Sequence, residues 1–398
     1  MCTFILSRDL ESQSDLILQS KPGGPDLTTK TTYKDFTILH NLLWITGDFT
    51  QQPYSTDTYD FYLLGEVYNY VGKSELEFIY DLYISYGDEF IDHLDGEFLI
   101  IIVDKSSNLV HFYTDPWSTR QLWASENTFS TLQHAGSQRL KENSHYVWDG
   151  NNLNLINDCI VSWELSQYKE SLTDIHKALE NAIVKRWHKD SVLLLSGGTD
   201  SSTIAVILQK YELPTTCISF DFTANRDESD NIRKIKQHAS IHNYIFLDDL
   251  SSQTLTNDLA SRIRDLGKRV CLTGNDYDGV YENYIHKPKV QTPNMFDSFP
   301  EDLSTIFPWY HFGNGIVRKI CDVWETAYLE KSIELRNCYL DKILVQEFLW
   351  LSNSLKNIRP KHFLRSYLEQ HNVDLEFKNI GYKSHIAAGS IKNDNMAV

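Results

Sequence analysis

The sequence predicts a mixed fold, α+β in its first part and α/β in its second, and three observations carry that prediction. Short apolar or alternating runs recur up to about residue 155, separated by Gly, Pro, Asp and Asn, which indicates β-structure. From about residue 165, strand-like and helix-like segments alternate, which is typical of a doubly wound, mostly parallel sheet. The length of 398 residues favours two domains over one.

The first part is expected to be mostly strands with one clear helix. The helix is predicted over Ser74–Tyr86, because Leu76, Ile79 and Tyr83 fall on one face at helical spacing. The predicted strands are Cys2–Leu6, Phe36–Ile45, Phe61–Val67, Phe98–Asp104 and Leu109–Thr114.

The second part is expected to alternate between strands and helices. The predicted strands are Val192–Leu195, Thr216–Phe222, Tyr244–Leu247 and Val270–Thr273. The predicted helices are Leu172–Trp187, Ser201–Tyr211, Glu228–Ile241, Thr254–Leu266, Ile316–Asn337 and Leu344–Leu355. The rhythm changes near Asn157–Gln167, so we expect domains over 1–160 and 161–398.

Composition narrows the class of protein. The formal net charge of -17 and the lack of a Lys/Arg-rich block argue against nucleic-acid and anionic-membrane binding. Cysteines are scattered with no C-x-x-C pair, which suits a reducing compartment. The start of the chain has no signal-peptide pattern, and the longest apolar run, Phe98–Val103, is too short to span a bilayer. We therefore expect a cytoplasmic protein.

The strongest local signal is Ser196-Gly197-Gly198-Thr199-Asp200-Ser201-Ser202, which follows the apolar run that ends at Leu195. Two glycines let the backbone approach a phosphate, and the N–H groups at a helix start face the anion. The serines add hydroxyl donors, and Asp200 suits a ligand of phosphate-bound Mg²⁺. The G-K-[ST] ending of a Walker A loop is absent. The alternative is a plain strand–turn–helix joint.

This segment resembles the PP-loop of N-type ATP pyrophosphatases, which split ATP into AMP and pyrophosphate. A second stretch, Leu272–Tyr284, resembles the asparagine-synthetase segment S-G-E-G-x-D-E-x-F-x-G-Y through Gly274 and Asp278. The resemblance implies that Asp278 is a second magnesium carboxylate. Two family acids are replaced, by Asn275 and Gly279. The nucleotide-binding residues implied in this way are Leu195, Ser196, Gly197, Gly198, Asp200, Ser201, Ser202 and Gly274.

Three later segments resemble the same family. Asn337–Asp341 is similar to P-F-L-D, and Lys361–Arg365 is similar to K-x-x-L-R. Lys378–Lys383 lies near where the family has K-x-G-F. The resemblance implies a catalytic lysine there that contacts the acyl-adenylate and the pyrophosphate, with Lys378 the first choice and Lys383 the second.

Cys2 is the candidate nucleophile of the first part. Removal of the initiator Met would leave a thiol beside its own α-amine, a compact nucleophile and base. The alternative is a buried strand cysteine. Nearby segments resemble the class II glutamine-amidotransferase domain of asparagine synthetases, an N-terminal-nucleophile αββα sandwich. These are Gly23–Asp26, Gln52–Pro53, Leu64–Asn69, Leu94–Phe98 and Thr114–Pro116.

The resemblance implies that Gly65, Glu66 and Asp95 bind glutamine. Two family residues are missing, because the oxyanion Asn is Leu64 and the carboxylate-binding Arg falls at Leu42 or Leu43. Loss of one oxyanion donor costs on the order of 10²–10³ in rate. We therefore expect weak glutamine hydrolysis in this half.

Three hypotheses follow from these residues. The first is an ATP- and Mg²⁺-dependent amidotransferase that adenylates a carboxylate, aspartate or a related acid, and amidates it with glutamine-derived or free ammonia. The second is an amide-forming synthetase that uses another amine, similar to β-lactam-forming or peptide-cyclising relatives, with an inactive glutaminase half. The third is a non-catalytic protein that kept the fold, which the intact Ser196–Ser202 segment opposes. The expected partners are small molecules, and a homodimer is compatible with the resemblance.

Overall fold

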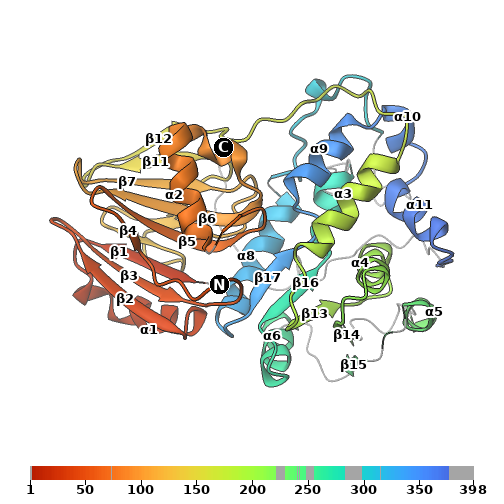
Figure 1. Cartoon of the computed structure of the whole chain (residues 1–398), viewed down its shortest axis with the longest axis horizontal. Coiled ribbons are helices and arrows are strands. Elements are labelled where there is room, and N and C mark those ends of the chain that lie inside the picture. The colour runs from red at the N-terminus through yellow and green to blue at the C-terminus, as the bar shows by residue number, and fades with distance from the viewer. Residues whose placement is uncertain are drawn as a thin grey trace.

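The computed structural model describes residues 2–375 apart from 73, 221–228, 240, 242, 248–254, 283–297 and 314. This part of the chain contains two six-stranded sheets and one five-stranded sheet. The two larger sheets belong to the first part of the chain, and the smaller sheet belongs to the second part. Figure 1 shows these two parts side by side. The structure therefore confirms a mixed α/β architecture with a parallel sheet.

The two larger sheets are antiparallel. The first has the order β10-β8-β9-β1-β3-β2 and the second β12-β11-β7-β6-β5-β4. Strands of the first are β1 (Thr3–Ser7), β2 (Leu27–Thr32), β3 (Thr37–Leu42), β8 (Trp123–Ala124), β9 (Thr128–Ser130) and β10 (Gln138–Arg139). Strands of the second are β4 (Tyr54–Ser55), β5 (Tyr59–Val67), β6 (Gly96–Asp104), β7 (Leu109–Thr114), β11 (His145–Trp148) and β12 (Leu153–Asn157).

These two sheets are stacked between helices. Alternate side chains of β5 point to opposite faces, as the period of a strand requires. Tyr62 and Leu64 pack in the core shared with the first sheet, whereas Phe61 packs against α2 (Glu75–Tyr86). The other face of the first sheet is covered in part by α1 (Ser14–Ser20). The first part is therefore a helix–sheet–sheet–helix stack.

The third sheet is parallel, with the order β15-β14-β13-β16-β17. This order is that of a doubly wound fold, in which ligands bind at the carboxyl ends of the strands. Its strands are β13 (Ser191–Leu194), β14 (Thr216–Phe220), β15 (Tyr244–Leu247), β16 (Val270–Thr273) and β17 (Glu334–Asn337). Helices here are α3 (Thr173–Val184), α4 (Thr199–Lys210), α5 (Ser229–His238), α6 (Leu255–Asp265), α7 (Tyr277–Tyr281), α8 (Gly315–Leu329), α9 (Lys342–Trp350), α10 (Asn353–Lys356) and α11 (His362–Gln370).

Helices cover both faces of the parallel sheet. Leu193 and Leu272 pack on the face shared with α3, α4, α9 and α11. Val192 and Cys271 pack on the face shared with α6 and α8. Because both faces are buried, β13 and β16 are almost entirely apolar, which is why the sequence shows these two strands clearly.

Two predicted helices were wrong in part. The helix predicted over Ile316–Asn337 ends at Leu329, and the chain then forms β17 at the edge of the parallel sheet. Glu334 and Arg336 make β17 look polar, although both are buried in ion pairs. The signal for this strand is therefore absent from the sequence.

The segment predicted as one helix over Leu344–Leu355 is also broken. It forms α9 and α10, separated at Leu351, whose ψ of 141° is extended. Ser352 then begins the next helix by accepting a hydrogen bond from the backbone N–H of Leu355. Among the described residues, no helix has the length and apolar character that crossing a bilayer requires.

Candidate active site

The loop between β13 and α4 is shaped by two glycines and two serines. Gly197 has a φ of +83°, a region that favours glycine, and Gly198 precedes the first turn of α4. Ser201 Oγ accepts from the N–H of Ser196 at 3.1 Å, and Ser196 Oγ accepts from the N–H of Gly198 at 3.2 Å. The loop and the start of α4 form a surface suited to an anion.

The neighbouring residues of this loop are held firmly. Leu195 is buried, and its N–H donates to the carbonyl of Ile218 in β14 at 2.8 Å. Ser202 is also buried, and its hydroxyl has no hydrogen-bond partner among the described residues. A buried hydroxyl without a hydrogen-bond partner is costly in free energy.

The loop after β16 packs against the first loop. A Cβ on Gly274 would lie 3.3 Å from Cβ of Asp200 and 3.0 Å from the ring of Tyr339. Glycine therefore lets the two loops approach each other. Asp278 follows in α7, which brings it to the same region as Asp200. The two carboxylates that the sequence predicts as a metal pair are thus neighbours in space.

Lys361 joins these two carboxylates. Its Nζ lies 2.6 Å from Oδ2 of Asp200 and 2.8 Å from Oδ1 of Asp278. Burial alone would lower the pKa of Lys361, but the two carboxylates raise it above its usual value. The N–H of Lys361 also donates to Oε1 of Glu282 at 2.6 Å. Burial and the charge of Asp278 raise the pKa of Glu282 to about 8.

The sequence placed Lys361 in a family-like segment but gave it no role, and its contacts arise only in the folded chain. Its φ of +57° is unusual for a residue with a side chain. The two lysines predicted as catalytic, Lys378 and Lys383, lie outside the described residues. Lys361 is therefore the described lysine that the fold brings to both predicted metal carboxylates.

The two residues that depart from the family pattern, Gly279 and Asn275, each have distinct surroundings in the structure. A Cβ on Gly279 would lie 2.4 Å from Val317 of α8, so a side chain there would force that helix away. The carbonyl of Gly279 accepts from the indole N–H of Trp309 at 2.9 Å. Asn275 is half-buried, and its amide Nδ2 has no hydrogen-bond partner among the described residues. It is a free polar group beside the two loops.

Cys2 lies in a separate pocket at the start of β1. Its Sγ accepts from the N–H of Leu43 at 3.5 Å, and burial raises the pKa of the thiol to about 11. The pocket has a free volume of about 50 Å³. Pockets for small molecules usually have about 300–1,000 Å³, so a glutamine would require the lining to move. The lining includes Leu42, Leu43, Gly65 and Glu66.

Gly65 and Glu66 therefore lie beside Cys2, as the sequence predicts. Gly65 has a φ of +109°, and a Cβ there would lie 1.9 Å from the carbonyl oxygen of Glu97. Glu66 accepts a short hydrogen bond from Thr46, and burial together with the charge of Glu334 raises its pKa to about 7. Glu75, which the sequence did not single out, lines the same pocket.

Asp95 does not line this pocket. Its carboxylate forms an ion pair with Lys185 of α3, and Lys185 also lies 2.5 Å from Oδ2 of Asp341. The structure thus places Asp95 in contacts between the two parts of the chain rather than among the residues around Cys2.

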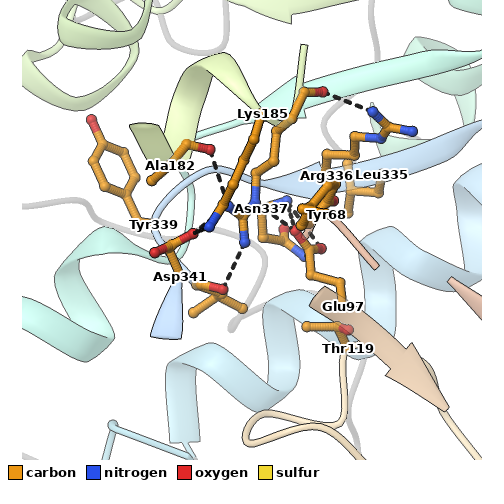
Figure 2. Close-up of polar contacts among 12 residues, drawn as sticks. Tyr68, Glu97, Thr119, Ala182, Lys185, Leu335, Arg336, Asn337, Tyr339 and Asp341 are labelled. Carbon is orange, nitrogen blue, oxygen red and sulfur yellow. Dashed lines mark hydrogen bonds and ion pairs between the residues drawn. The ribbon is translucent and has the colours of Figure 1, made fainter. Parts of the chain in front are cut away.

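These contacts belong to a buried charge network between the two parts, and Figure 2 draws the contacts around Glu97 and Asp341. At its centre, Glu97 of β6 accepts from Nε of Arg186 at 2.8 Å and from Nδ2 of Asn337 at 3.2 Å. Arg186 donates onward to Asp341 at 2.7 Å, and its guanidinium lies over the ring of Tyr68. Because each charge has a partner of opposite sign, the network holds the two parts together without stranding a charge.

Comparisons with known proteins find similarity to asparagine synthetases. Residues 174–268 match the family model described as asparagine synthase. A probable glutamine-hydrolysing asparagine synthetase of Dictyostelium discoideum is 24% identical over 69% of this chain and 62% of its own length. The asparagine synthetase of Asparagus officinalis is 22% identical over 87% of this chain and 67% of its own. The chain thus matches about two thirds of the length of these relatives.

Two further comparisons are with another sequence relative and with a solved structure. A putative asparagine synthetase of Methanocaldococcus jannaschii is 29% identical over 44% of this chain and 41% of its own length. The solved glutamine phosphoribosylpyrophosphate amidotransferase of B. subtilis has a TM-score of 0.34 at 8% identity, over 96% of this chain and 98% of its own. A similarity as low as the last carries no weight here.

Proposed function

We propose that this chain, a divergent relative of the asparagine-synthetase type, is an ATP-dependent carbon–nitrogen ligase that adenylates a carboxylate and converts it to an amide. One observation carries the proposal: the Ser196–Ser202 loop and the carboxylates of Asp200 and Asp278 meet at Lys361. Three separate segments thus form one charged site at the carboxyl end of a parallel sheet, where ligands of such folds bind.

The loop residues would bind the phosphates of ATP. The N–H groups at the start of α4 and the hydroxyl of Ser196, the exposed serine of this loop, would donate to phosphate oxygens. Lys361 would contribute a positive charge next to them. The substrate carboxylate oxygen attacks the α-phosphorus, the bond to the β-phosphate oxygen breaks, and pyrophosphate leaves. The nitrogen nucleophile then attacks the acyl carbon, AMP leaves, and the nitrogen loses a proton.

The residues present fit a magnesium ion. Asp200 and Asp278 already converge on one cation, the ammonium of Lys361, at 2.6 and 2.8 Å. Carboxylate oxygens are the ligands that Mg²⁺ prefers. When bound, the ion would supply charge neutralisation on the pyrophosphate. Lys361 would then leave the space between the two carboxylates and reach the phosphates instead.

We further propose that free ammonia serves better than glutamine as nitrogen donor. Burial keeps the Cys2 thiol protonated, and leucines take the places of the expected oxyanion amide and carboxylate-binding arginine. Leu64 is buried in the core and has no polar group to donate. A buried carboxylate of the substrate would have no partner beside Leu42 and Leu43.

A second candidate function is amide formation with an amine other than ammonia, in which the Cys2 pocket takes no part. The same leucines favour it, because they remove the glutamine-binding groups and leave the ATP loops intact. In both cases, we assign residues 1–160 to a domain of the N-terminal-nucleophile type and 161–398 to a PP-loop domain.

One experiment tests the proposed function. The protein is incubated with ATP and Mg²⁺, with ammonium or glutamine, and with aspartate and a panel of related carboxylates. Pyrophosphate, glutamate and the amide are measured separately. Acceptor-dependent pyrophosphate release with an amide product supports the ligase. Glutamate without any pyrophosphate would instead assign the chain to glutamine hydrolysis alone.

A further inference from the structure

A second group of ligand-type side chains lies on the second sheet, apart from both sites described above. It consists of Asp88, His111 and His145, from η3 (Gly87–His93), β7 and β11. None of the three lines the Cys2 pocket. Figure 1 shows β7 and β11 on the side of the molecule opposite α4 and α11.

Strand pairing brings the two histidines together. His145 of β11 pairs with Tyr113 of β7, and Val147 pairs with His111. Residues directly opposite in an antiparallel pair share a face, so His111, Tyr113 and His145 point to the same side. Tyr113 packs in the core that this face of the sheet shares with α2 and η3. Asp88 of η3 therefore lies over the two imidazoles.

The distances within the group are those of potential metal ligands. His111 Nδ1 lies 3.1 Å from His145 Nε2, and the other ring nitrogen of His145, Nδ1, lies 3.9 Å from Oδ2 of Asp88, so the two distances belong to different nitrogens of His145. One ligand atom from each residue lies within 4.8 Å of the other two. Ligand atoms of a tetrahedral zinc site are about 3.3 Å apart, given bonds of about 2.0–2.1 Å. Binding one ion therefore requires the three ligand atoms to move closer together, which the Asp88 side chain can do because it is 60% exposed.

Two features prepare the group for a cation. The facing imidazole nitrogens share one proton, so one of them presents a lone pair, and a cation would use the lone pairs of both. Tyr113 donates its hydroxyl to Oδ1 of Asp88 at 2.5 Å, which orients the carboxylate and leaves Oδ2 toward His145.

We propose that Asp88, His111 and His145 bind one divalent zinc-type ion. Two imidazole nitrogens and one carboxylate oxygen are a donor set that suits zinc. Three protein ligands leave a fourth position, and solvent reaches it past the exposed Asp88. The ion would connect η3 to β7 and β11. This site is independent of the proposed ligase activity, and its test needs no substrate.

The test is a zinc titration of the full chain after treatment with a chelator, read by calorimetry. His111→Ala is expected to lose one zinc equivalent, and Asp88→Asn to bind at least about 10-fold more weakly. Glu89→Gln and His93→Ala are matched controls on η3 and should bind as the parent does. Tyr113→Phe should weaken binding by about 10- to 100-fold, since it removes the hydrogen bond that orients Asp88.

A spectroscopic readout separates this site from zinc bound elsewhere. Cobalt(II) in place of zinc should give a visible band in the parent that is absent in His111→Ala. Circular dichroism should show that the variants are folded. If His111→Ala does not fold, Asp88→Asn provides the decisive test, because Asp88 is exposed and its substitution is not expected to disturb the core. Equal zinc stoichiometry and affinity in the parent, His111→Ala and Asp88→Asn would overturn the proposal.

Discussion

Lys361 and Asp200 form an ion pair at 2.6 Å although they are far apart in the sequence. The same ammonium reaches Asp278 at 2.8 Å, so one monovalent cation neutralises carboxylates from two separate loops. Two carboxylates would bind a divalent ion more strongly than a single ammonium group. The ammonium of Lys361 would then be able to contact the phosphates of ATP. The proposed function therefore predicts that a divalent ion replaces Lys361 between the two carboxylates when ATP is bound.

Asp200→Ala should abolish formation of AMP and pyrophosphate while the fold stays intact. The reason is loss of a metal carboxylate beside a highly charged leaving group, which costs several kcal/mol, or about 100-fold or more in rate. Asp278→Ala should behave in the same way. Pyrophosphate release is the measurement, with Asp149→Ala as an exposed control. Near-normal turnover in either site variant would remove that residue from the metal pair.

Lys361→Met should have opposite effects on two kinds of binding. Without ATP, Mg²⁺ should bind about 10-fold more tightly, a gain of roughly 1.4 kcal/mol, because no ammonium competes for the carboxylates. With ATP, turnover should fall, because a charge at the phosphates is missing. Magnesium titration and pyrophosphate release are the two measurements. If Mg²⁺ affinity stayed unchanged, the lysine and the metal would not share a site.

The nucleotide products should be AMP and pyrophosphate, with no ADP. The loop lacks the lysine of a Walker A segment, and its resemblance is to enzymes that cleave between the α and β phosphates. Chromatography of the nucleotides after complete turnover is sufficient. ADP and phosphate in stoichiometric amounts would contradict the proposed adenylation reaction.

Cys2→Ala should leave ammonia-dependent synthesis unchanged and remove only a small glutamine-dependent rate. The pKa of the thiol is about 11, so thiolate makes up about one part in ten thousand at pH 7. Since the pKa is raised, the reactive thiolate increases as pH rises, and any glutaminase activity should rise with it. Rates with saturating glutamine and ammonium are compared in both proteins. If glutamine is the better nitrogen donor, and Cys2→Ala removes that advantage, the prediction that ammonia is preferred is wrong.

Glu97→Gln should destabilise the contact between the two parts of the chain. It leaves the buried guanidinium of Arg186 with less opposite charge, and breaking such a buried pair costs about 3–5 kcal/mol. Urea unfolding followed by fluorescence should show a lower midpoint. The exposed Glu126→Gln is the matched control and should change the midpoint little. An equal shift in both variants would show that the network adds no stability.

Some strands of the parallel sheet could be predicted from the local sequence pattern, and one could not. Runs such as that ending at Leu195 were recognisable because both faces of the strand are buried and every residue is apolar. β17 was not, because the buried charges of Glu334 and Arg336 look like surface residues without their partners. A short, charged edge strand has no local signal that separates it from a helix end.

The sequence by itself determined the two loops of the candidate site, because glycines, serines and a helix start act through the backbone nearby. It also determined the alternation of strands and helices, which depends on local periodicity. Only the tertiary structure decided that Lys361 pairs with Asp200, that Asp95 pairs with Lys185, and that His111 meets His145. Such pairings join residues far apart in the chain, and their energy exists only once packing excludes water and brings the charges within a few ångströms.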